Sequence, residues 1–150
     1  MAVGAPAASA CWTGEKSEVT ILYTNDVHTY IDNKSPKLTY AAIAAMKQGY
    51  VDEGKPVLLV DAGDHIQGTA YGSMDDGATI IELMNEAGYD IATLGNHEFD
   101  YGFPQLMENL KKHQGDFMVA CNNLVDDEGE LIFAPGGTAP IYADDTYETE

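Results

Sequence analysis

Basic residues are scarce in this chain of 150 residues, which has seven lysines and arginines against 25 aspartates and glutamates. The resulting net charge of −18 argues against binding of nucleic acid or of an anionic membrane through the general surface, because both partners are negatively charged. Clustered carboxylates suit hard divalent cations, but a solvated acidic surface explains the same composition. Composition alone therefore leaves metal binding open.

Long apolar runs and paired cysteines are also missing. No run approaches 18 residues, so no transmembrane segment is expected, while 45% hydrophobic content is enough for one globular domain with a real core. Cys11 and Cys121 lie far apart and show no CxxC spacing, which excludes a zinc knuckle and a dithiol redox motif. A disulfide between them stays open.

The first 16 residues have features of an export signal. Ala8-Ser9-Ala10 fits the A-x-A rule for signal-peptidase cleavage, and Cys11 follows it as a weaker candidate for lipidation. The basic and long apolar parts of a signal are missing, so an ordinary disordered terminus is the alternative. We expect an export-signal remnant over residues 1–16, a domain over residues 17–150, and a periplasmic, cell-envelope or extracellular location.

Apolar strands alternate with helical segments along the domain. Strands are expected at 19–24, 56–60, 90–94 and 117–121. Helices are expected from Ser35-Pro36 to Gly49 and over 78–87 and 104–112. The apolar face of the first helix is formed by Leu38, Ala42, Ala45 and Met46. This alternation predicts an α/β fold with parallel strands, right-handed crossovers and helices on both sheet faces.

The pattern weakens after Asn123. Residues 126–130 predict a turn that leads into an edge strand at 131–133. The acidic end, residues 143–150, has no core-forming pattern. No internal repeat, linker or second domain is visible.

Polar side chains gather where three of the expected strands end. They are Asp26 and His28 after the first strand, Asp64 after the second, and Asn96, His97 and Asp100 after the third. The carboxyl ends of parallel strands meet at one edge of a sheet, where ligands bind. Asp26 and His28 are two residues apart, so on an extended segment both side chains point the same way. These donors suit zinc, manganese, cobalt, iron or magnesium, and exclude copper(I) and iron–sulfur clusters.

The donor types also predict roles. An aspartate can bridge two metal ions about 4 Å apart, and Asp64 is the natural bridge. Asn96 adds a neutral ligand and is a candidate for substrate binding. His97 is expected to face the substrate, where it could stabilise phosphoryl charge or protonate the leaving oxygen. Asp100, three residues on, could accept the ring N–H of His97 and orient it.

Each of these residues taken singly has a plainer explanation. Asp26 and Asp64 could form Asx turns, and Asn96 and Asp100 could cap a helix. His65 and His113 lie outside any ligand context. It is the coincidence of three such strand ends that favours a metal site.

The motifs Asp26-Val27-His28, GDHIQG (63–68) and GNHEFD (95–100) together resemble the calcineurin-like metallophosphoesterases. The likeness covers residues 17–135 and is strongest to the 5′-nucleotidase and UDP-sugar hydrolase branch. It implies the first βαβαβαβ half of an α/β/β/α sandwich, and hydrolysis of nucleotide or nucleotide-sugar phosphate esters. It also implies two divalent metal ions. The implied ligands are Asp26, His28, Asp64 and Asn96, and the implied catalytic pair is His97 with Asp100.

The sequence departs from this family in one respect. The later histidine motifs and the C-terminal domain of the family are not present in these residues, so we expect a truncated domain with three ligands for one metal and two for the other. Such a site predicts weak turnover or none. The alternative is a metal-binding fragment without catalysis, or half of a split enzyme that needs a separate C-terminal chain.

Overall fold

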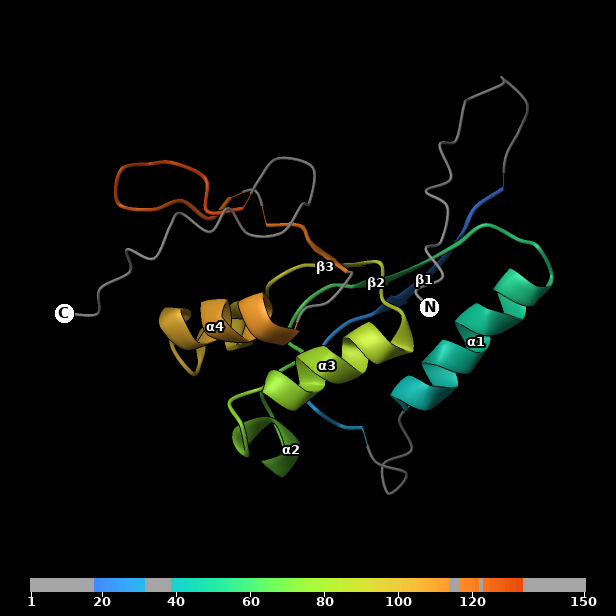
Figure 1. Cartoon of the computed structure of the whole chain (residues 1–150), viewed down its shortest axis with the longest axis horizontal. Coiled ribbons are helices and arrows are strands. Elements are labelled where there is room, and N and C mark those ends of the chain that lie inside the picture. The colour runs from blue at the N-terminus through green and yellow to red at the C-terminus, as the bar shows by residue number, and fades with distance from the viewer. Residues whose placement is uncertain (1–17, 32–38, 114–116, 122, 134–150) are drawn as a thin grey trace, which may run out of the picture.

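The computed structural model describes residues 18–31, 39–113, 117–121 and 123–133. The expected export signal, the Ser35-Pro36 dipeptide and the acidic end lie outside these residues. The elements, shown in Figure 1, are β1 (Thr20–Thr24), α1 (Tyr40–Asp52), β2 (Val57–Asp61), α2 (Ala70–Ser73), α3 (Ala78–Ala87), β3 (Ile91–Ala92), η1 (Asn96–Phe99), α4 (Phe103–His113) and β4 (Met118–Val119).

The four strands form one parallel sheet in the order β1-β2-β3-β4. In its register, Thr24 lies opposite Asp61, Asp61 opposite Ala92, and Ala92 opposite Val119. Parallel neighbours need a crossover between them, which the intervening helices provide. The parallel α/β architecture predicted from the alternating pattern is therefore confirmed.

The helices cover only one face of this sheet among the described residues. Figure 1 shows α1, α3 and α4 side by side on the same side of the strands. Each crossover steps to the next strand in the same direction, and right-handed crossovers of that kind place every helix on one face. The opposite face exposes apolar side chains of three strands, namely Ile21, Tyr23, Leu58 and Met118. The expectation of helices on both faces is therefore wrong for this part of the chain.

Helix α1 begins later than the sequence predicted. Thr39 caps it, since the Thr39 hydroxyl accepts the backbone N–H of Ala42 at 3.3 Å, and the helix continues through Gly49. Tyr40 and Ile43 form its buried face, whereas Met46 is exposed. Most positions at the start of this helix are alanine, so the spacing of its apolar residues does not distinguish the buried face, and the predicted face was wrong. Packing of Tyr40 edge-on against Tyr89 decides it instead.

Helices α3 and α4 agree with the prediction, and α3 contributes more buried apolar residues than any other described element. Ile80, Ile81 and Met84 are fully buried on α3. Gly88 ends this helix with a left-handed φ of 78°, which favours glycine. Strands β3 and β4 are shorter than expected, and α2 and η1 were not anticipated.

The residues after β4 contain the predicted turn but less strand than predicted. The turn at 126–130 is present, with the N–H of Asp126 bonded to the carbonyl of Glu130. The expected edge strand is reduced to an isolated antiparallel bridge between Val125 and Leu131. Cys121 is buried with a free thiol.

Candidate metal centre

The first site loop follows β1 and turns sharply. Asp26, His28 and Thr29 all have positive φ, at 53°, 48° and 58°, so this segment is not extended, and an extended backbone is the wrong reason for aligning Asp26 with His28. Asp26 and His28 nevertheless lie together, with Asp26 Oδ1 3.5 Å from His28 Nε2. Backbone bonds explain this, because the amides of both residues donate to carbonyls of the loop after β2, at Gly63 and Asp64.

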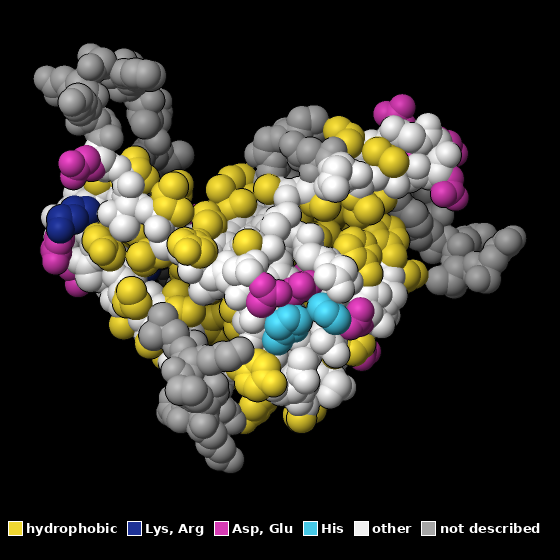
Figure 2. Space-filling view, turned by 180° about the vertical axis from the view of Figure 1, so that it is seen from behind, with side chains coloured by type: hydrophobic (Ala, Val, Ile, Leu, Met, Phe, Trp, Pro, Cys, Tyr) yellow, Lys and Arg dark blue, Asp and Glu magenta, His cyan; other side chains and the backbone are white. Residues whose placement is uncertain are grey.

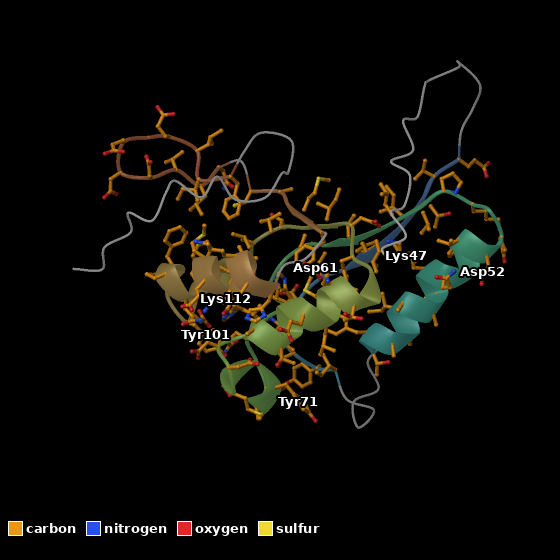
Figure 3. The ribbon with its side chains drawn as sticks, viewed as in Figure 1. Lys47, Asp52, Asp61, Tyr71, Tyr101 and Lys112 are labelled. Atoms are coloured by element: carbon orange, nitrogen blue, oxygen red, sulfur yellow. The ribbon has the colours of Figure 1, made fainter. Side chains whose placement is uncertain are left out.

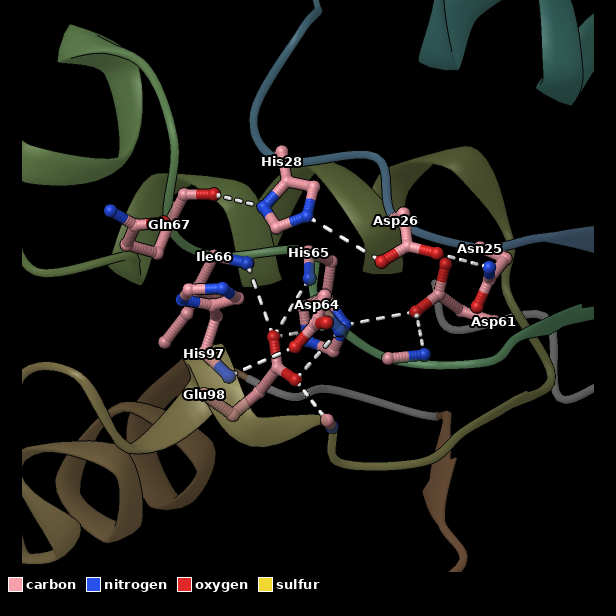
Figure 4. Close-up of polar contacts among 12 residues, drawn as sticks. Asn25, Asp26, His28, Asp61, Asp64, His65, Ile66, Gln67, His97 and Glu98 are labelled. Carbon is pink, nitrogen blue, oxygen red and sulfur yellow. Dashed lines mark hydrogen bonds and ion pairs between the residues drawn. The ribbon is translucent and has the colours of Figure 1, made fainter.

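The His28 ring is oriented by its other nitrogen. His28 Nδ1 lies 3.0 Å from the carbonyl oxygen of Gln67, as Figure 4 shows. A histidine that binds a metal through one ring nitrogen usually donates the other N–H to a carbonyl or carboxylate. His28 therefore has its Nε2 available as a ligand.

The second site loop carries Asp64, with a left-handed φ of 59°. Its Oδ1 accepts the backbone N–H of His97 at 2.9 Å, so the loops after β2 and β3 are in direct contact. There is no space for a side chain between them. A Cβ on Gly95 would lie 2.2 Å from Asp64 Oδ1, and one on Gly63 would lie 2.5 Å from Gly95 N.

The third site loop presents His97 and Asp100 as a hydrogen-bonded pair. His97 Nδ1 and Asp100 Oδ2 are 2.7 Å apart, which is the geometry expected for an orienting carboxylate. This hydrogen bond, with the negative charge of Asp100, raises the pKa of His97 above its ordinary value. Asn96 begins η1 and is exposed, and Asp100 follows the last residue of that helix.

Three side chains from the three loops converge. One ligand atom each from His28, Asp64 and His97 can be chosen so that all lie within 4.8 Å of one another. The rings of His28 and His97 meet edge to face with centroids 5.1 Å apart. In Figure 2, histidine and acidic side chains lie together on one surface of the molecule. Asp26 is outside this group of three and contacts it through His28.

The donor types of this cluster fit a divalent metal ion. Two imidazoles and a carboxylate match the ligands of zinc sites and also suit manganese, cobalt and iron. Magnesium prefers oxygen ligands throughout and fits less well. The pattern of three protein donors is the one found where zinc keeps a position open for water or substrate.

Glu98 is part of the site loops, and sequence reasoning missed it. It is fully buried beneath Asp64 and His97, and both of its carboxylate oxygens accept backbone N–H groups. The donors are Asp64 at 2.8 Å, His65 at 2.7 Å, Ile66 at 3.3 Å and Gly95 at 2.6 Å. A glutamate three residues after the start of a helical turn is half of a capping box, and that signal was available in GNHEFD.

His65 and Asp61 form a second buried pair below the loops. His65 Nδ1 lies 2.9 Å from Asp61 Oδ1 and 3.6 Å from Glu98 Oε1. Burial by itself lowers the pKa of His65, but the hydrogen bond to Asp61 and the charge of Glu98 outweigh it and raise that pKa above its ordinary value. Figure 3 shows Asp61 between the sheet and the helices. These contacts place His65 in the protein interior.

Comparison with known proteins identifies a family whose match includes all three site loops. The family model described as calcineurin-like phosphoesterase matches residues 19–149. The 5′-nucleotidase of Homo sapiens is 39% identical over 138 residues, which cover 83% of this chain and 23% of that protein. A snake venom 5′-nucleotidase from Gloydius brevicauda is 38% identical over 115 residues, covering 70% of this chain and 20% of that protein. The chain thus spans about a fifth of the length of these relatives.

Solved structures similar to this chain also include a calcineurin-like phosphoesterase and a nucleotidase. The calcineurin-like phosphoesterase YfkN from Bacillus subtilis aligns with a TM-score of 0.63 and 32% identity, covering 78% of this chain and 40% of that chain. The NAD nucleotidase NadN from Haemophilus influenzae aligns with a TM-score of 0.63 and 28% identity, covering 79% of this chain and 24% of that chain.

Within the described segments, every helix is too short or too polar to cross a bilayer.

Proposed function

Because the chain belongs to the calcineurin-like phosphoesterase family, we propose that its three site loops bind divalent metal ions and take part in hydrolysis of a phosphate ester. The observation that carries this proposal is the convergence of His28, Asp64 and His97 from three strand ends that are far apart in sequence. In an open α/β sheet, ligands bind outside the carboxyl ends of the strands, which is where these three side chains meet.

The proposed ligands are Asp26, His28, Asp64 and Asn96, with two ions and Asp64 between them. Two observations support this assignment. His28 Nε2 faces Asp26 Oδ1, so an ion near one of them is near both. Asp64 uses Oδ1 to accept the N–H of His97, which leaves Oδ2 for an ion. When bound, the ions would polarise the phosphoryl group and activate the attacking water.

His97 is proposed to act on the substrate, with Asp100 orienting it. His97 Nδ1 donates a hydrogen bond to the Asp100 carboxylate, which raises the pKa of His97, so a larger fraction of the ring is protonated near neutral pH. A protonated ring can stabilise charge on the phosphoryl oxygens or donate its Nε2 proton to the leaving oxygen. His97 lies in the same cluster as His28 and Asp64, so its ring would face a phosphate group held by ions at those residues.

The proposed substrate class is a nucleotide or nucleotide-sugar phosphate ester. Its support is the names of the relatives, which include 5′-nucleotidases and an NAD nucleotidase. Export of the protein is part of the proposal, supported by Ala8-Ser9-Ala10 and by a relative from snake venom. Detection of the protein in the cell envelope or medium, rather than in the cytoplasm, tests that part.

A second candidate function is metal binding without turnover, either alone or as half of a split enzyme. Among the described residues, only three His, Asp, Glu or Cys donors come together at the site, and this small number favours the second candidate. A catalytic zinc site needs at least this number, so a second ion would be weakly held. We expect weak turnover from this chain for that reason.

One assay separates these functions. The chain is incubated with Mn²⁺, Zn²⁺ or Co²⁺ and with AMP or bis-p-nitrophenyl phosphate, beside the Asp64→Asn variant. Metal-dependent release of phosphate from AMP, or of p-nitrophenol from bis-p-nitrophenyl phosphate, that is lost in Asp64→Asn supports hydrolysis. Metal binding without release supports the second candidate. Neither binding nor release by the wild-type chain would contradict both.

A further inference from the structure

The buried carboxylate of Glu98 accepts hydrogen bonds from four backbone N–H groups of the site loops. Its Oε2 accepts from Asp64 and Gly95, one on each side of the junction between the two loops, and its Oε1 accepts from His65 and Ile66. Both oxygens act only as acceptors, so the group facing these amides is a carboxylate. Hydrogen bonds to a charged acceptor are roughly twice as strong as neutral ones.

The charge of this carboxylate has a partner in the interior. His65 Nδ1 lies 3.6 Å from Glu98 Oε1, and the Asp61 carboxylate holds the same ring nitrogen at 2.9 Å. A buried carboxylate without such support is strongly destabilising. The surroundings of Glu98 therefore favour a fixed, fully bonded carboxylate below the site.

The junction that Glu98 spans is also where the site is assembled. On one side of it lies Asp64, and on the other lies His97, next to Glu98 in sequence. These two residues are joined directly by the hydrogen bond from the His97 amide to Asp64 Oδ1, at 2.9 Å. Glu98 does not take part in that bond. It holds the backbone of Asp64 on one side and that of Gly95 on the other.

We propose that Glu98 is a positioning residue that sets the placement of Asp64 relative to His97. Its consequence for metal binding rests on the proposed function, whereas the placement itself does not. If Glu98 had a purely structural role, loss of its carboxylate would instead lower the stability of the whole domain without weakening the Asp64–His97 hydrogen bond selectively.

Amide hydrogen exchange of the metal-free chain tests the placement. In Glu98→Gln, the side-chain amide turns an N–H group towards some of the donors, so their bonds are lost while the side chain keeps its size. We expect the amides of Asp64, Gly95 and His97 to exchange about tenfold faster or more relative to those of Ile81 and Met84 in α3, which report global opening. The His97 amide is decisive, because Glu98 does not bond it.

Two further variants complete the comparison. Asn109→Ala removes another buried polar side chain, which bonds to the carbonyl of Asp76 and to Gln105 on α4, away from the site loops. We expect it to leave the His97 amide unchanged relative to α3. Glu98→Asp keeps the charge but is one methylene shorter, so we expect an intermediate effect, and this variant replaces Glu98→Gln if the latter does not fold.

A Co²⁺ titration of the same proteins measures the consequence for the site. We expect binding to Glu98→Gln to be about 10- to 100-fold weaker and binding to Asn109→Ala to be unchanged. Unchanged relative exchange at His97 would overturn the positioning role, and unchanged Co²⁺ affinity in a variant with faster exchange would overturn its consequence for metal binding. If the wild-type chain binds no Co²⁺, the proposed function fails, while the exchange of the His97 amide still decides the role of Glu98.

Discussion

The carboxylate of Asp64 accepts the backbone N–H of His97, with 2.9 Å between Oδ1 and the nitrogen. This bond joins the proposed bridging ligand to the proposed catalytic residue across two loops that are about thirty residues apart in sequence. The placement of each residue therefore depends on the other loop. Changes that separate the loops should affect the site before they affect the fold.

Replacing Gly95 with alanine tests that dependence. A Cβ at this position would lie 2.2 Å from Asp64 Oδ1 and 2.8 Å from Asp64 N, so the Asp64 side chain and backbone must move. We expect Gly95→Ala to weaken Co²⁺ binding by about tenfold or more, measured by titration.

Gly49→Ala is the matched control for that variant. Gly49 lies in α1 and is exposed, and a Cβ added there would have no atom within 4 Å. Alanine is favoured over glycine inside a helix by about 1 kcal/mol, so urea unfolding should show a more stable protein with unchanged Co²⁺ affinity. Equal Co²⁺ affinities for the two glycine variants would contradict the tight junction.

Substitutions of His97 and Asp100 test the assigned roles. We expect His97→Ala to lower metal-dependent turnover by about 10²- to 10⁴-fold, the usual contribution of a general acid. Asp100→Asn keeps the ring but weakens its orientation, so a smaller loss, of about 10- to 100-fold, is expected. The measurement is initial-rate kinetics with bis-p-nitrophenyl phosphate.

His113→Ala serves as the control for these two variants. His113 pairs with Glu82 at 2.6 Å, a distance similar to that of the His97–Asp100 pair, but on the surface of α4 and α3. Its removal should leave turnover unchanged. A His97→Ala variant that retains the turnover of the wild-type chain would show that this ring is not catalytic.

Much of the fold follows from local patterns. The apolar run at β2 and the spacing of Ile80, Ile81 and Met84 in α3 predict these elements because their buried faces contrast strongly with their surroundings. The start of α1 could not be placed in this way. Its alanines have no such contrast, and the contact between Tyr40 and Tyr89 joins residues that are distant in sequence.

The candidate site could be predicted in its residue types but not in its construction. The strand-end rule brings Asp26, His28, Asp64 and His97 to one edge, whatever the loop conformation. The positive φ angles at Asp26, His28 and Asp64 depend on bonds between loops, so the sequence alone predicted an extended segment wrongly. The burial of Glu98 depends on amides from the other site loop, which no local pattern reveals.

Lys47 provides a prediction about stability that is independent of the site. As Figure 3 shows, it lies on α1, and its ammonium group bonds to the carbonyl of Gly88 at 2.5 Å and to Asp90 at 2.8 Å. Lys47→Ala removes both bonds at the end of α3, so we expect a loss of about 1–2 kcal/mol in the free energy of unfolding, measured with urea.

The exposed pair of Lys112 and Glu108 is the control for Lys47. Both side chains are more than half exposed, and such pairs contribute little to stability. Lys112→Ala should therefore leave the urea midpoint unchanged. Equal losses in the two lysine variants would show that the contacts of Lys47 with Gly88 and Asp90 do not stabilise α3.

Metal binding by the three site loops is tested most directly by a Co²⁺ titration of the wild-type chain, followed through the visible absorption of the ion, beside His28→Ala and His113→Ala. We expect saturable binding to the wild-type chain and to His113→Ala. Binding to His28→Ala should be weaker by about 100-fold or more, because one of the few protein donors is lost. Equal affinity of His28→Ala and wild type, or no saturable binding by the wild-type chain, would contradict a metal centre at these loops.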